Sequence, residues 1–302
     1  MTTPLRVGRR TIEVSRRDKP LWPRDGITKG ALVDYYAGVA PAMVPHLRGR
    51  LLTLERYPDG IEGGRFFSKE IPRHFPEWVD RFEVAKEGGT VTHVVCNRPD
   101  TLVYLANQAC ITMHAGLSRV DDVDTPDHMI YDLDPSSDDF GVVRSAARAM
   151  RALLDELGLA SFVKTSGSRG LHVVVPFDRR QPFRDVRAFA RDVARVAAER
   201  DPERVTVEQR KDNRRGRLFL DWMRNAYGQH AAAPYTVRAR PGAPVATPLS
   251  WDELDEPDMH ARRFTMDDVL RRVDEGVEPW RGWRRRARGL AGARRRLDRL
   301  DT

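Results

Sequence analysis

Hydrophobic and polar residues alternate over a short stretch near the middle of the chain, from His128 to Asp134. The alternation predicts a β-strand whose apolar side chains point to one side and whose acids point to the other. On that second face, Asp132 and Asp134 lie roughly 6.6 Å apart along the strand, at about 3.3 Å per residue. Pro135 cannot continue a central ladder, so we expect both acids at an open strand end. The alternative is a pair of solvated acids that open a loop.

Apolar residues at helical spacing predict several helices along the chain. Thr28 is the expected N-cap of the first, and Gly158 is the expected stop after the third. The predicted helices span residues 29–44, 101–114, 139–157 with Asp138 or Asp139 as the cap, 182–200 with Pro182 at its first position, and 267–273.

Short apolar runs between turn residues predict strands on both sides of these helices. They cover residues 6–14 (an edge strand or hairpin), 51–54, 65–69, 91–95, 162–164, 171–175 and 217–221, while residues 231–250 are rich in Pro and Gly and are expected to form an extended loop. Strands and helices interleave without a strict β-α-β order. The pattern therefore favours an α/β (α+β) fold with mixed sheets over a single doubly wound sheet.

The composition limits the class of protein. A chain of 302 residues suits one large domain or two smaller lobes. Its two cysteines, Cys96 and Cys110, have neither metal-ligand spacing nor a disulfide framework. We find no signal sequence and no apolar run long enough to cross a bilayer. The expected location is cytoplasmic and nucleoid-associated, with no membrane partner.

Positive charge is concentrated at the C-terminus. Residues 281–302 contain nine Arg and two Asp, a net charge of +7, which leaves +1 of the total +8 for the rest of the chain. An arm of this kind favours polyanions through counterion release, and we hypothesise that it adds nonspecific DNA affinity. The alternative is an Arg-rich solvated helix.

Two further features carry candidate chemistry. In the turn Ser166-Gly167-Ser168-Arg169-Gly170-Leu171-His172, the glycines allow backbone N–H groups to converge on an anion, and a hydroxyl, a guanidinium and an imidazole lie beside them. Gly- and Ser-containing hairpins are common, so this turn alone is weak evidence. Asp221 ends an apolar strand far along the chain, where a lone acid is usually a cap.

Together these features match the needs of nucleotidyl transfer. Carboxylates hold two divalent ions about 3.5–4 Å apart, which activate a 3′-hydroxyl and stabilise the leaving pyrophosphate. Cationic and N–H donors then clamp the phosphates, because the protein contributes mainly positioning and charge.

The same segments resemble the archaeo-eukaryotic primase superfamily, and more closely the polymerase domain of bacterial ligase D in a stand-alone form. The matching segments are Asp132-Leu133-Asp134-Pro135, 164–172, Leu220-Asp221, 45–50, 56–60, 72–76 and 233–240. The resemblance reaches about residue 275. It implies two mixed or antiparallel sheets that form a cleft flanked by helices. We accordingly expect one catalytic domain with two packed lobes over residues 1–280 and an Arg-rich tail over 281–302.

The resemblance also implies roles for individual residues. Asp132, Asp134 and Asp221 would bind two Mn²⁺ or Mg²⁺ ions. Ser166, Arg169, His172, Arg238 and Arg240 would hold the triphosphate, His114 the sugar, Phe66 and Phe67 the bases, and Lys19 and Lys29 a DNA 5′-phosphate. Without the resemblance, the two Phe would be core aromatics, His114 a satisfied histidine at a helix end, and the two Lys ordinary surface residues.

Two positions depart from the family pattern. Glu55 stands where the family usually has Lys, and its carboxylate would repel phosphate. Arg224 stands where the family often has Gln, and it could strengthen the phosphate clamp or alter a template contact.

The predicted function is a template-dependent polymerase of the primase type. It would add nucleotides, with ribonucleotides preferred, to a primer 3′ end at gaps or double-strand-break ends in non-homologous end joining. The expected partners are 5′-phosphorylated DNA, NTP or dNTP, and as candidates Ku and a separate DNA ligase, with the chain as a monomer or a DNA-bridged dimer. The alternatives are a metal-dependent Asp-x-Asp glycosyltransferase, which has no need for Asp221, and a non-catalytic DNA-end module.

Overall fold

The computed structural model describes residues 2–300, and its chain divides into two compact units. Unit 1 comprises the residues up to Asp121 together with His230–Thr247 and Phe264–Glu278. Unit 2 comprises Asp122–Gln229, Pro248–Arg263 and the residues from Pro279 onward. Each unit contains one main sheet, so the prediction of two sheets in a mixed α/β fold is confirmed. Among the described helices, none is long and apolar enough to cross a membrane.

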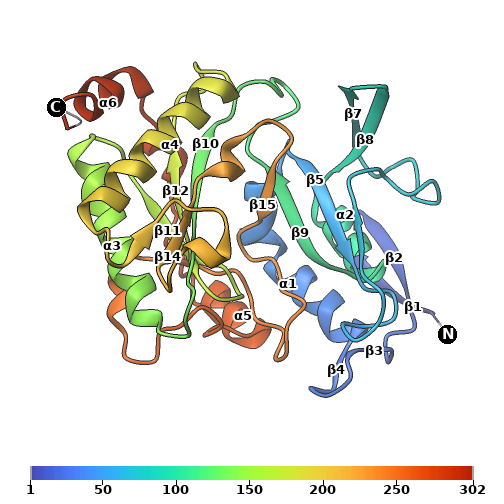
Figure 1. The fold of residues 1–302 in the computed structure, drawn as a ribbon. Coiled ribbons are helices and arrows are strands. Elements are labelled where there is room, and N and C mark those ends of the chain that lie inside the picture. The colour runs from blue at the N-terminus through green and yellow to red at the C-terminus, as the bar shows by residue number, and fades with distance from the viewer. Residues whose placement is uncertain (1, 301–302) are drawn as a thin grey trace. The chain divides into compact units, whose positions relative to one another are not determined.

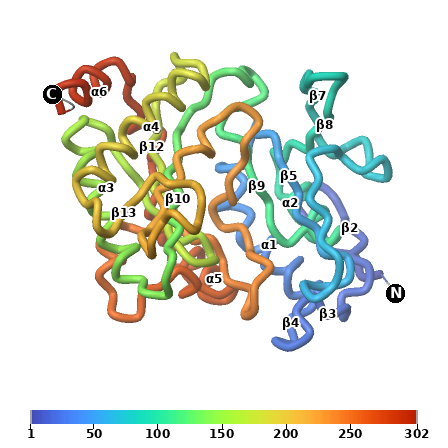
Figure 2. Tube along the Cα trace, in the orientation of Figure 1, coloured from blue at the N-terminus to red at the C-terminus, as the bar shows by residue number. Residues whose placement is uncertain are grey.

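Unit 1 is organised around an antiparallel sheet with the strand order β15-β9-β5-β8-β7, to which β6 adds beside β5. The β7–β8 hairpin extends from this sheet (Figure 2). The strands are β5 (Leu51–Arg56), β6 (Phe66–Ser68), β7 (Arg81–Lys86), β8 (Gly89–Val95), β9 (Cys110–Gly116) and β15 (His230–Ala232). Two small hairpins precede them, β1 (Thr2–Val7) with β2 (Arg10–Ser15) and β3 (Pro20–Trp22) with β4 (Ile27–Thr28).

The helices of unit 1 are α1 (Lys29–Leu47), α2 (Pro99–Asn107) and α5 (Met266–Asp274). The Thr28 hydroxyl accepts a hydrogen bond from the Ala31 amide, so the predicted N-cap of α1 is confirmed. Helix α5 begins with a capping box in which Thr265 and Asp268 satisfy each other's backbone amides.

Unit 2 is organised around a six-stranded sheet with the order β13-β14-β10-β12-β11-β16. All neighbours are antiparallel except β13 and β14. The strands are β10 (His128–Asp134), β11 (Phe162–Thr165), β12 (Leu171–Pro176), β13 (Val205–Thr206), β14 (Leu218–Asp221) and β16 (Pro248–Leu249). The predicted strand that ends before Pro135 is therefore confirmed, and it lies between β12 and β14.

Helices α3 (Phe140–Glu156) and α4 (Phe183–Arg200) pack on one face of this sheet (Figure 1). Asp139 caps α3, and Gly158 has a φ of +72°, a left-handed conformation that suits glycine at the end of a helix. Pro182 is the N-cap of α4 and not its first helical residue, which shifts the predicted start by one position.

The predicted helix over residues 101–114 is wrong in its second half. Helix α2 ends at Asn107, and β9 begins at Cys110. Ala109, between them, has a φ of +54°, which stops the helix. The apolar run of β9 is buried in the middle of a sheet, where both faces are covered, so its sequence does not alternate and resembles that of a buried helix.

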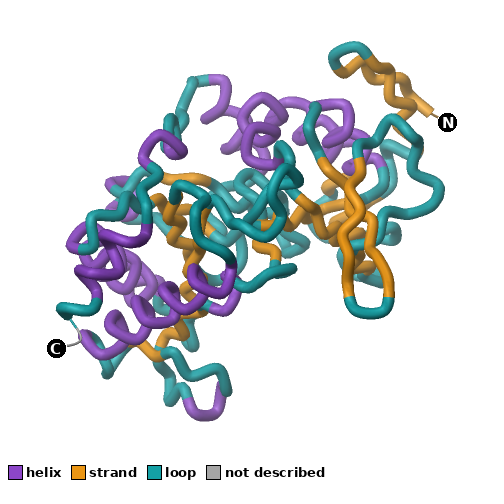
Figure 3. The backbone as a smooth tube through the Cα atoms, turned by 90° about the horizontal axis from the view of Figure 1, so that it is seen from above, coloured by secondary structure: helices purple, strands orange, loops and turns teal. Residues whose placement is uncertain are grey.

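The C-terminal residues pack on unit 2. Helix α6 (Leu290–Leu297) lies beside α4, and Figure 3 shows it next to the other helices. Its buried residues are Leu290, Ala293 and Leu297. Arg294 of α6 bonds Asp192 of α4 at 2.7 Å. The segment that the sequence predicted as a tail therefore has an apolar side of its own.

Candidate active site

A row of polar residues crosses the sheet of unit 2. Asp132 on β10 lies directly opposite Asp221 on β14 and directly opposite His172 on β12. His172 in turn lies opposite Lys164 on β11. Directly opposed residues in antiparallel strands point to the same face, so all four side chains share one face of the sheet. Asp134, two residues further along β10, points to that face as well.

This face is the one that α3 and α4 leave uncovered. Tyr131 points the other way from Asp132, and its pKa is raised by burial and then by the charge of Asp192 on α4, against that of Arg294 on α6. The helices thus cover the apolar side of β10, and the acids lie on the opposite side. The register that aligns Asp132 with Asp221 brings together two residues that are far apart in the sequence.

The carboxylates lie close enough to disfavour one another's charge. Burial, followed by the negative charges of Asp221 and Asp134, raises the pKa of Asp132 to about 6. Arg224 and Lys164 act in the opposite direction. Burial also raises the pKa of Asp221, with a further contribution from Asp134, against the Met223 amide and the charges of Arg224 and Arg214. The site therefore concentrates negative charge in a partly desolvated place.

Arginines pair with the outer acids. Asp134 accepts hydrogen bonds from Arg169 at 3.0 Å and from Arg214 at 3.2 Å. The guanidinium of Arg224 lies 3.5 Å from Asp221. Arg169 and Arg224 were predicted to bind phosphate, and in the structure they contact the acids.

Arg214 and Lys164 also belong to this site, although no role was predicted for either from the sequence. The Arg214 side chain is only 8% exposed, and it also donates to the carbonyls of Glu208 and Gln209. Arg214 lies in a loop without periodicity, so only its tertiary contact with Asp134 reveals it. Lys164 is fully buried. The feature of the sequence that could have indicated its role is its position at the end of a predicted strand, just before the Gly-rich turn.

The Gly-rich turn closes onto the Ser166 hydroxyl. The backbone amides of Ser168 and Gly170 both donate to the Ser166 Oγ, at 3.2 and 3.1 Å. A Cβ atom on Gly170 would lie 1.7 Å from the carbonyl oxygen of Leu133, so only glycine fits there. The turn is thus held against the end of β10, beside Asp134, with N–H groups that converge on one oxygen atom.

The donor set suits a hard divalent cation, although the side chains are not arranged around one. Three carboxylates on one sheet face, with the pKa of Asp132 raised by burial and then by its acidic neighbours, are the type of ligand that Mg²⁺ or Mn²⁺ prefers. Over residues 2–300, however, no group of three or more His, Cys, Asp or Glu side chains is placed so that it could hold a metal ion. The reason is local, since Asp134 and Asp221 are turned toward arginines.

A second group of predicted residues lies in unit 1. Phe66 and Phe67 on β6 are 58% and 57% exposed, so the alternative that they are core aromatics is wrong. The Phe67 ring contacts the edge of the His114 ring at a centroid distance of 5.3 Å. His114 lies on β9 and not at a helix end.

Glu55 bonds His114. Its carboxylate lies 3.0 Å from the His114 Nε2 and accepts a bond of 2.7 Å from the Tyr57 hydroxyl. Burial would raise the pKa of Glu55, but these hydrogen bonds and the charges of His114 and Arg238 lower it to about 2. Glu55 is therefore ionised and acts on His114 directly.

The remaining predicted residues also belong to unit 1. The carbonyl of Arg240 accepts a hydrogen bond from the Trp22 indole. Lys19 and Lys29 are neighbours, because the Lys29 amide donates to the Lys19 carbonyl. Burial, followed by the charges of Arg16 and Lys19, lowers the pKa of Lys29 to about 8. Its ammonium bonds Ser15 and Asn107, so Lys29 is a buried residue and not an ordinary surface lysine.

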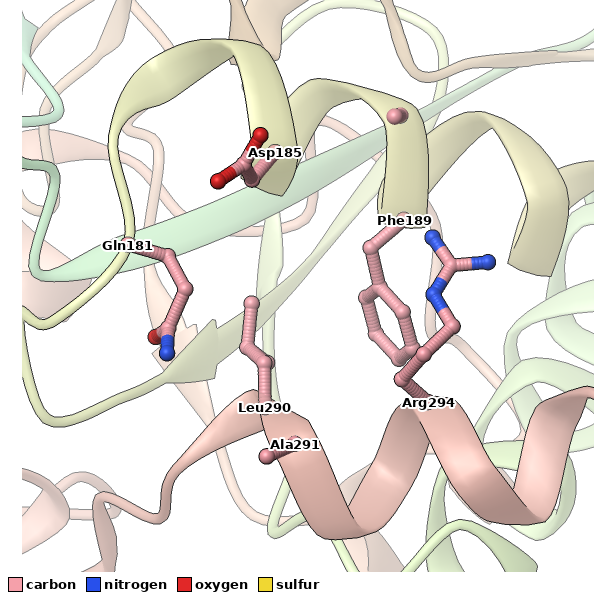
Figure 4. Close-up of a pocket in the computed structure, with 7 residues that line it drawn as sticks. Gln181, Asp185, Phe189, Leu290, Ala291 and Arg294 are labelled. Atoms are coloured by element: carbon pink, nitrogen blue, oxygen red, sulfur yellow. The ribbon is translucent and has the colours of Figure 1, made fainter.

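A pocket of about 320 Å³ lies elsewhere in unit 2, between α4 and α6 (Figure 4). It is lined by Gln181, Asp185, Ala188, Phe189, Leu290, Ala291 and Arg294. Because α4 packs on the face of the sheet opposite the carboxylates, this pocket is separate from the candidate active site.

The fold is that of the primase-polymerase class of nucleotidyltransferases. Comparison with known proteins narrows the class further. The profile of the family described as "LigD, primase-polymerase domain" matches residues 28–280, and the chain belongs to this family. The resemblance found in the sequence is thereby confirmed, and the family implies the use of a divalent metal.

Curated relatives and a solved structure agree with this assignment. The multifunctional non-homologous end joining protein LigD of Mycolicibacterium smegmatis is 36% identical over 270 residues, which are 87% of this chain and 35% of that protein. The bifunctional LigD of Bacillus subtilis is 30% identical over 264 residues, 87% of this chain and 42% of that protein. The polymerase domain from Mycobacterium tuberculosis ligase D in complex with DNA is 33% identical with a TM-score of 0.86, and the match covers 91% of this chain and 99% of that one. The chain thus spans only about a third of the M. smegmatis protein.

Proposed function

We propose that this chain is a template-dependent polymerase that extends a primer 3′ end at gaps or double-strand-break ends during non-homologous end joining. The observation that carries the proposal is the register of three strands, which places Asp221, Asp132 and His172 side by side on one sheet face. The names of the relatives and the DNA complex of the M. tuberculosis domain support the DNA-repair context.

In this proposal, Asp132, Asp134 and Asp221 hold two divalent ions, with Mn²⁺ preferred. When bound, such ions activate the primer hydroxyl and stabilise the leaving pyrophosphate. Ser166, His172 and the amides of the Gly-rich turn bind the triphosphate, and Arg169 and Arg224 move from the acids to the phosphates. Arg214 stays with Asp134, because its other bonds to backbone carbonyls hold it in place.

The residues of unit 1 complete the proposal. Phe66 and Phe67 stack on bases, which suits end filling at any sequence because every base has an aromatic face. His114 contacts the sugar of a preferred ribonucleotide, and Glu55 fixes the orientation of its ring. Arg238 and Arg240 add to the triphosphate site, and Lys19 and Lys29 bind a DNA 5′-phosphate.

The test is extension of a gapped, 5′-phosphorylated duplex with Mn²⁺, in which ribonucleotides are compared with deoxyribonucleotides. The D132A/D134A variant is the control. We expect templated addition by the wild type and none by the variant. End alignment that survives in D132A/D134A, with no extension by either protein, would instead support a non-catalytic DNA-end module.

A further inference from the structure

The C-terminal segment contains many more arginines than acids. Residues 281–300 contain nine arginines and a single acid, Asp298. The segment lies outside the part of the chain that the family profile matches, which ends at residue 280. The role of its positive charge must therefore be inferred from the contacts that these arginines make in this structure.

Some of these arginines serve the fold. Arg294 bonds Asp192 on α4, and its guanidinium lies over the Phe189 ring at 5.1 Å. Arg296 donates to the Leu157 carbonyl at the end of α3, at 3.0 Å. These contacts, with the buried side of α6, fix the segment on unit 2.

Other arginines point into solvent. Arg285, Arg286 and Arg288, which we call the arginine strip, are all exposed. Within the described residues, none of the three forms an ion pair with a carboxylate. Three exposed arginines elsewhere in unit 2, Arg184, Arg195 and Arg204, are ion-paired, since each lies within 3.3 Å of an acid on its own segment.

Two tryptophans anchor the strip to the sheet of unit 2. The Trp283 ring lies 5.7 Å from the His128 ring on β10 and 6.4 Å from the Phe162 ring on β11. The Trp280 indole donates to the Val163 carbonyl at 3.0 Å. His128 and Phe162 point to the same face as Asp132, because His128 precedes it by an even number of residues and Phe162 is aligned through Val174 with Ile130.

The strip is therefore attached to the sheet face that carries the acids. From His128 to Asp132, the strand rises by about 13 Å, which is the axial length of about four base pairs of duplex DNA. Trp280 and Trp283 are buried and fix the segment that carries the arginines on the sheet, so the arginines are displayed on a folded support and not on a free arm.

We propose that Arg285, Arg286 and Arg288 bind the phosphate backbone of duplex DNA whose primer end lies at the carboxylates. This inference rests on the proposed polymerase function for its choice of ligand. Arginine guanidinium groups without acidic partners are suited to phosphates, and binding them releases counterions, which makes the affinity depend on salt.

Point variants test the proposal better than deletion of the segment, which would also remove Trp283 and the buried side of α6. The strip variant is R285Q/R286Q/R288Q, and its matched control is R184Q/R195Q/R204Q, which removes the same charge from ion-paired arginines of the same unit. A third variant, R285K/R286K/R288K, keeps the charge. Circular dichroism and thermal unfolding check that each variant is folded.

The measurement is the affinity for a fluorescent duplex with a recessed 3′ end, in EDTA, between about 50 and 200 mM salt. With about 0.9 of salt slope for each phosphate contact, three lost contacts should lower the slope by about 2.7. The advantage of the wild type over the strip variant should then be about 40-fold larger at 50 mM than at 200 mM salt. The control and lysine variants should keep the wild-type slope.

An unchanged slope in the strip variant, or an equal loss in the matched control, would overturn the proposal. Failure of the polymerase function is distinguishable, because it appears as absent extension by the wild type and leaves the comparison of salt slopes intact. Conversely, normal primer extension together with equal salt slopes in all variants would reject DNA binding by the arginine strip and leave the polymerase function standing.

Discussion

Replacing Asp132 by Asn should stabilise the metal-free protein at neutral pH. Burial and the charges of Asp221 and Asp134 raise the pKa of Asp132 from 3.8 to about 6. This difference corresponds to about 3 kcal/mol against the ionised carboxylate in the folded state. Because 30% of the Asp132 side chain is exposed, solvent screening reduces the expected gain for D132N to about 1–2 kcal/mol.

The pH dependence of this gain has a defined sign. Between about pH 4 and 6, the folded state binds the Asp132 proton more tightly than the unfolded state does. Stability is therefore lost as the pH rises through that window, and the full penalty is present above about pH 6. We expect D132N to be more stable than the wild type at pH 7 and equal to it near pH 4, by urea unfolding in EDTA.

The same substitution at Asp134, on the same strand, should have the opposite effect on stability. It pairs with Arg169 and with the buried Arg214, so D134N removes a partner from a guanidinium that is 8% exposed. We expect D134N to lose about 1–2 kcal/mol where D132N gains. Mn²⁺ should stabilise the wild type and neither variant. A destabilised D132N, or a gain that is the same at pH 4 and pH 7, would refute the reasoning from charge repulsion.

Three further predictions concern Gly170 in unit 2 and Glu55 and Phe67 in unit 1. G170A should lose several kcal/mol of stability, because its Cβ would meet the Leu133 carbonyl, whereas G64A, where nothing lies within 4 Å, should change thermal unfolding little. The pKa of Glu55, lowered to about 2, makes its stabilisation present above about pH 4.5 and lost as the pH falls toward 2. E55Q should therefore cost about 1–2 kcal/mol at pH 7 and progressively less in acid, and a constant cost in urea titrations would contradict this. F67A should leave stability unchanged, since the ring is exposed, and weaken single-stranded template binding by about 1–3 kcal/mol in anisotropy titrations.

Local sequence pattern predicted the strand of the acids and the two strands beside it, but not how they pair. Alternation and Pro135 define β10 from His128 to Asp134, because both act within one segment. The pairing of Asp132 with Asp221 joins strands that are far apart in sequence, and no local signal fixes that register. Only the resemblance to a family predicted that Asp132 and Asp221 belong to one site. The structure shows the physical reason, which is that the two residues lie opposite each other on neighbouring strands.

Buried strands were the main source of error. Cys110–Gly116 is covered on both faces, so its apolar run lacks the period that separates strand from helix. Ala109, with its positive φ, is the break that ends α2, and an alanine gives no sign of this conformation in the sequence. Arg214 escaped prediction for a similar reason, since its partner Asp134 is distant in sequence.

The arginines beside the carboxylates compensate their negative charge. Three carboxylates on one partly buried face are unfavourable unless cations compensate them, and Arg169, Arg214 and Arg224 pair with two of these acids in the structure. Arg214 is 8% exposed and donates to two backbone carbonyls. Arg169, which donates to one carbonyl, that of Pro135, and Arg224 are both nearly half exposed. In the proposed reaction, Arg169 and Arg224 would leave the acids when divalent ions are bound there and would then contact the triphosphate. The same guanidinium groups would then stabilise the protein before substrate binds and the phosphates afterwards.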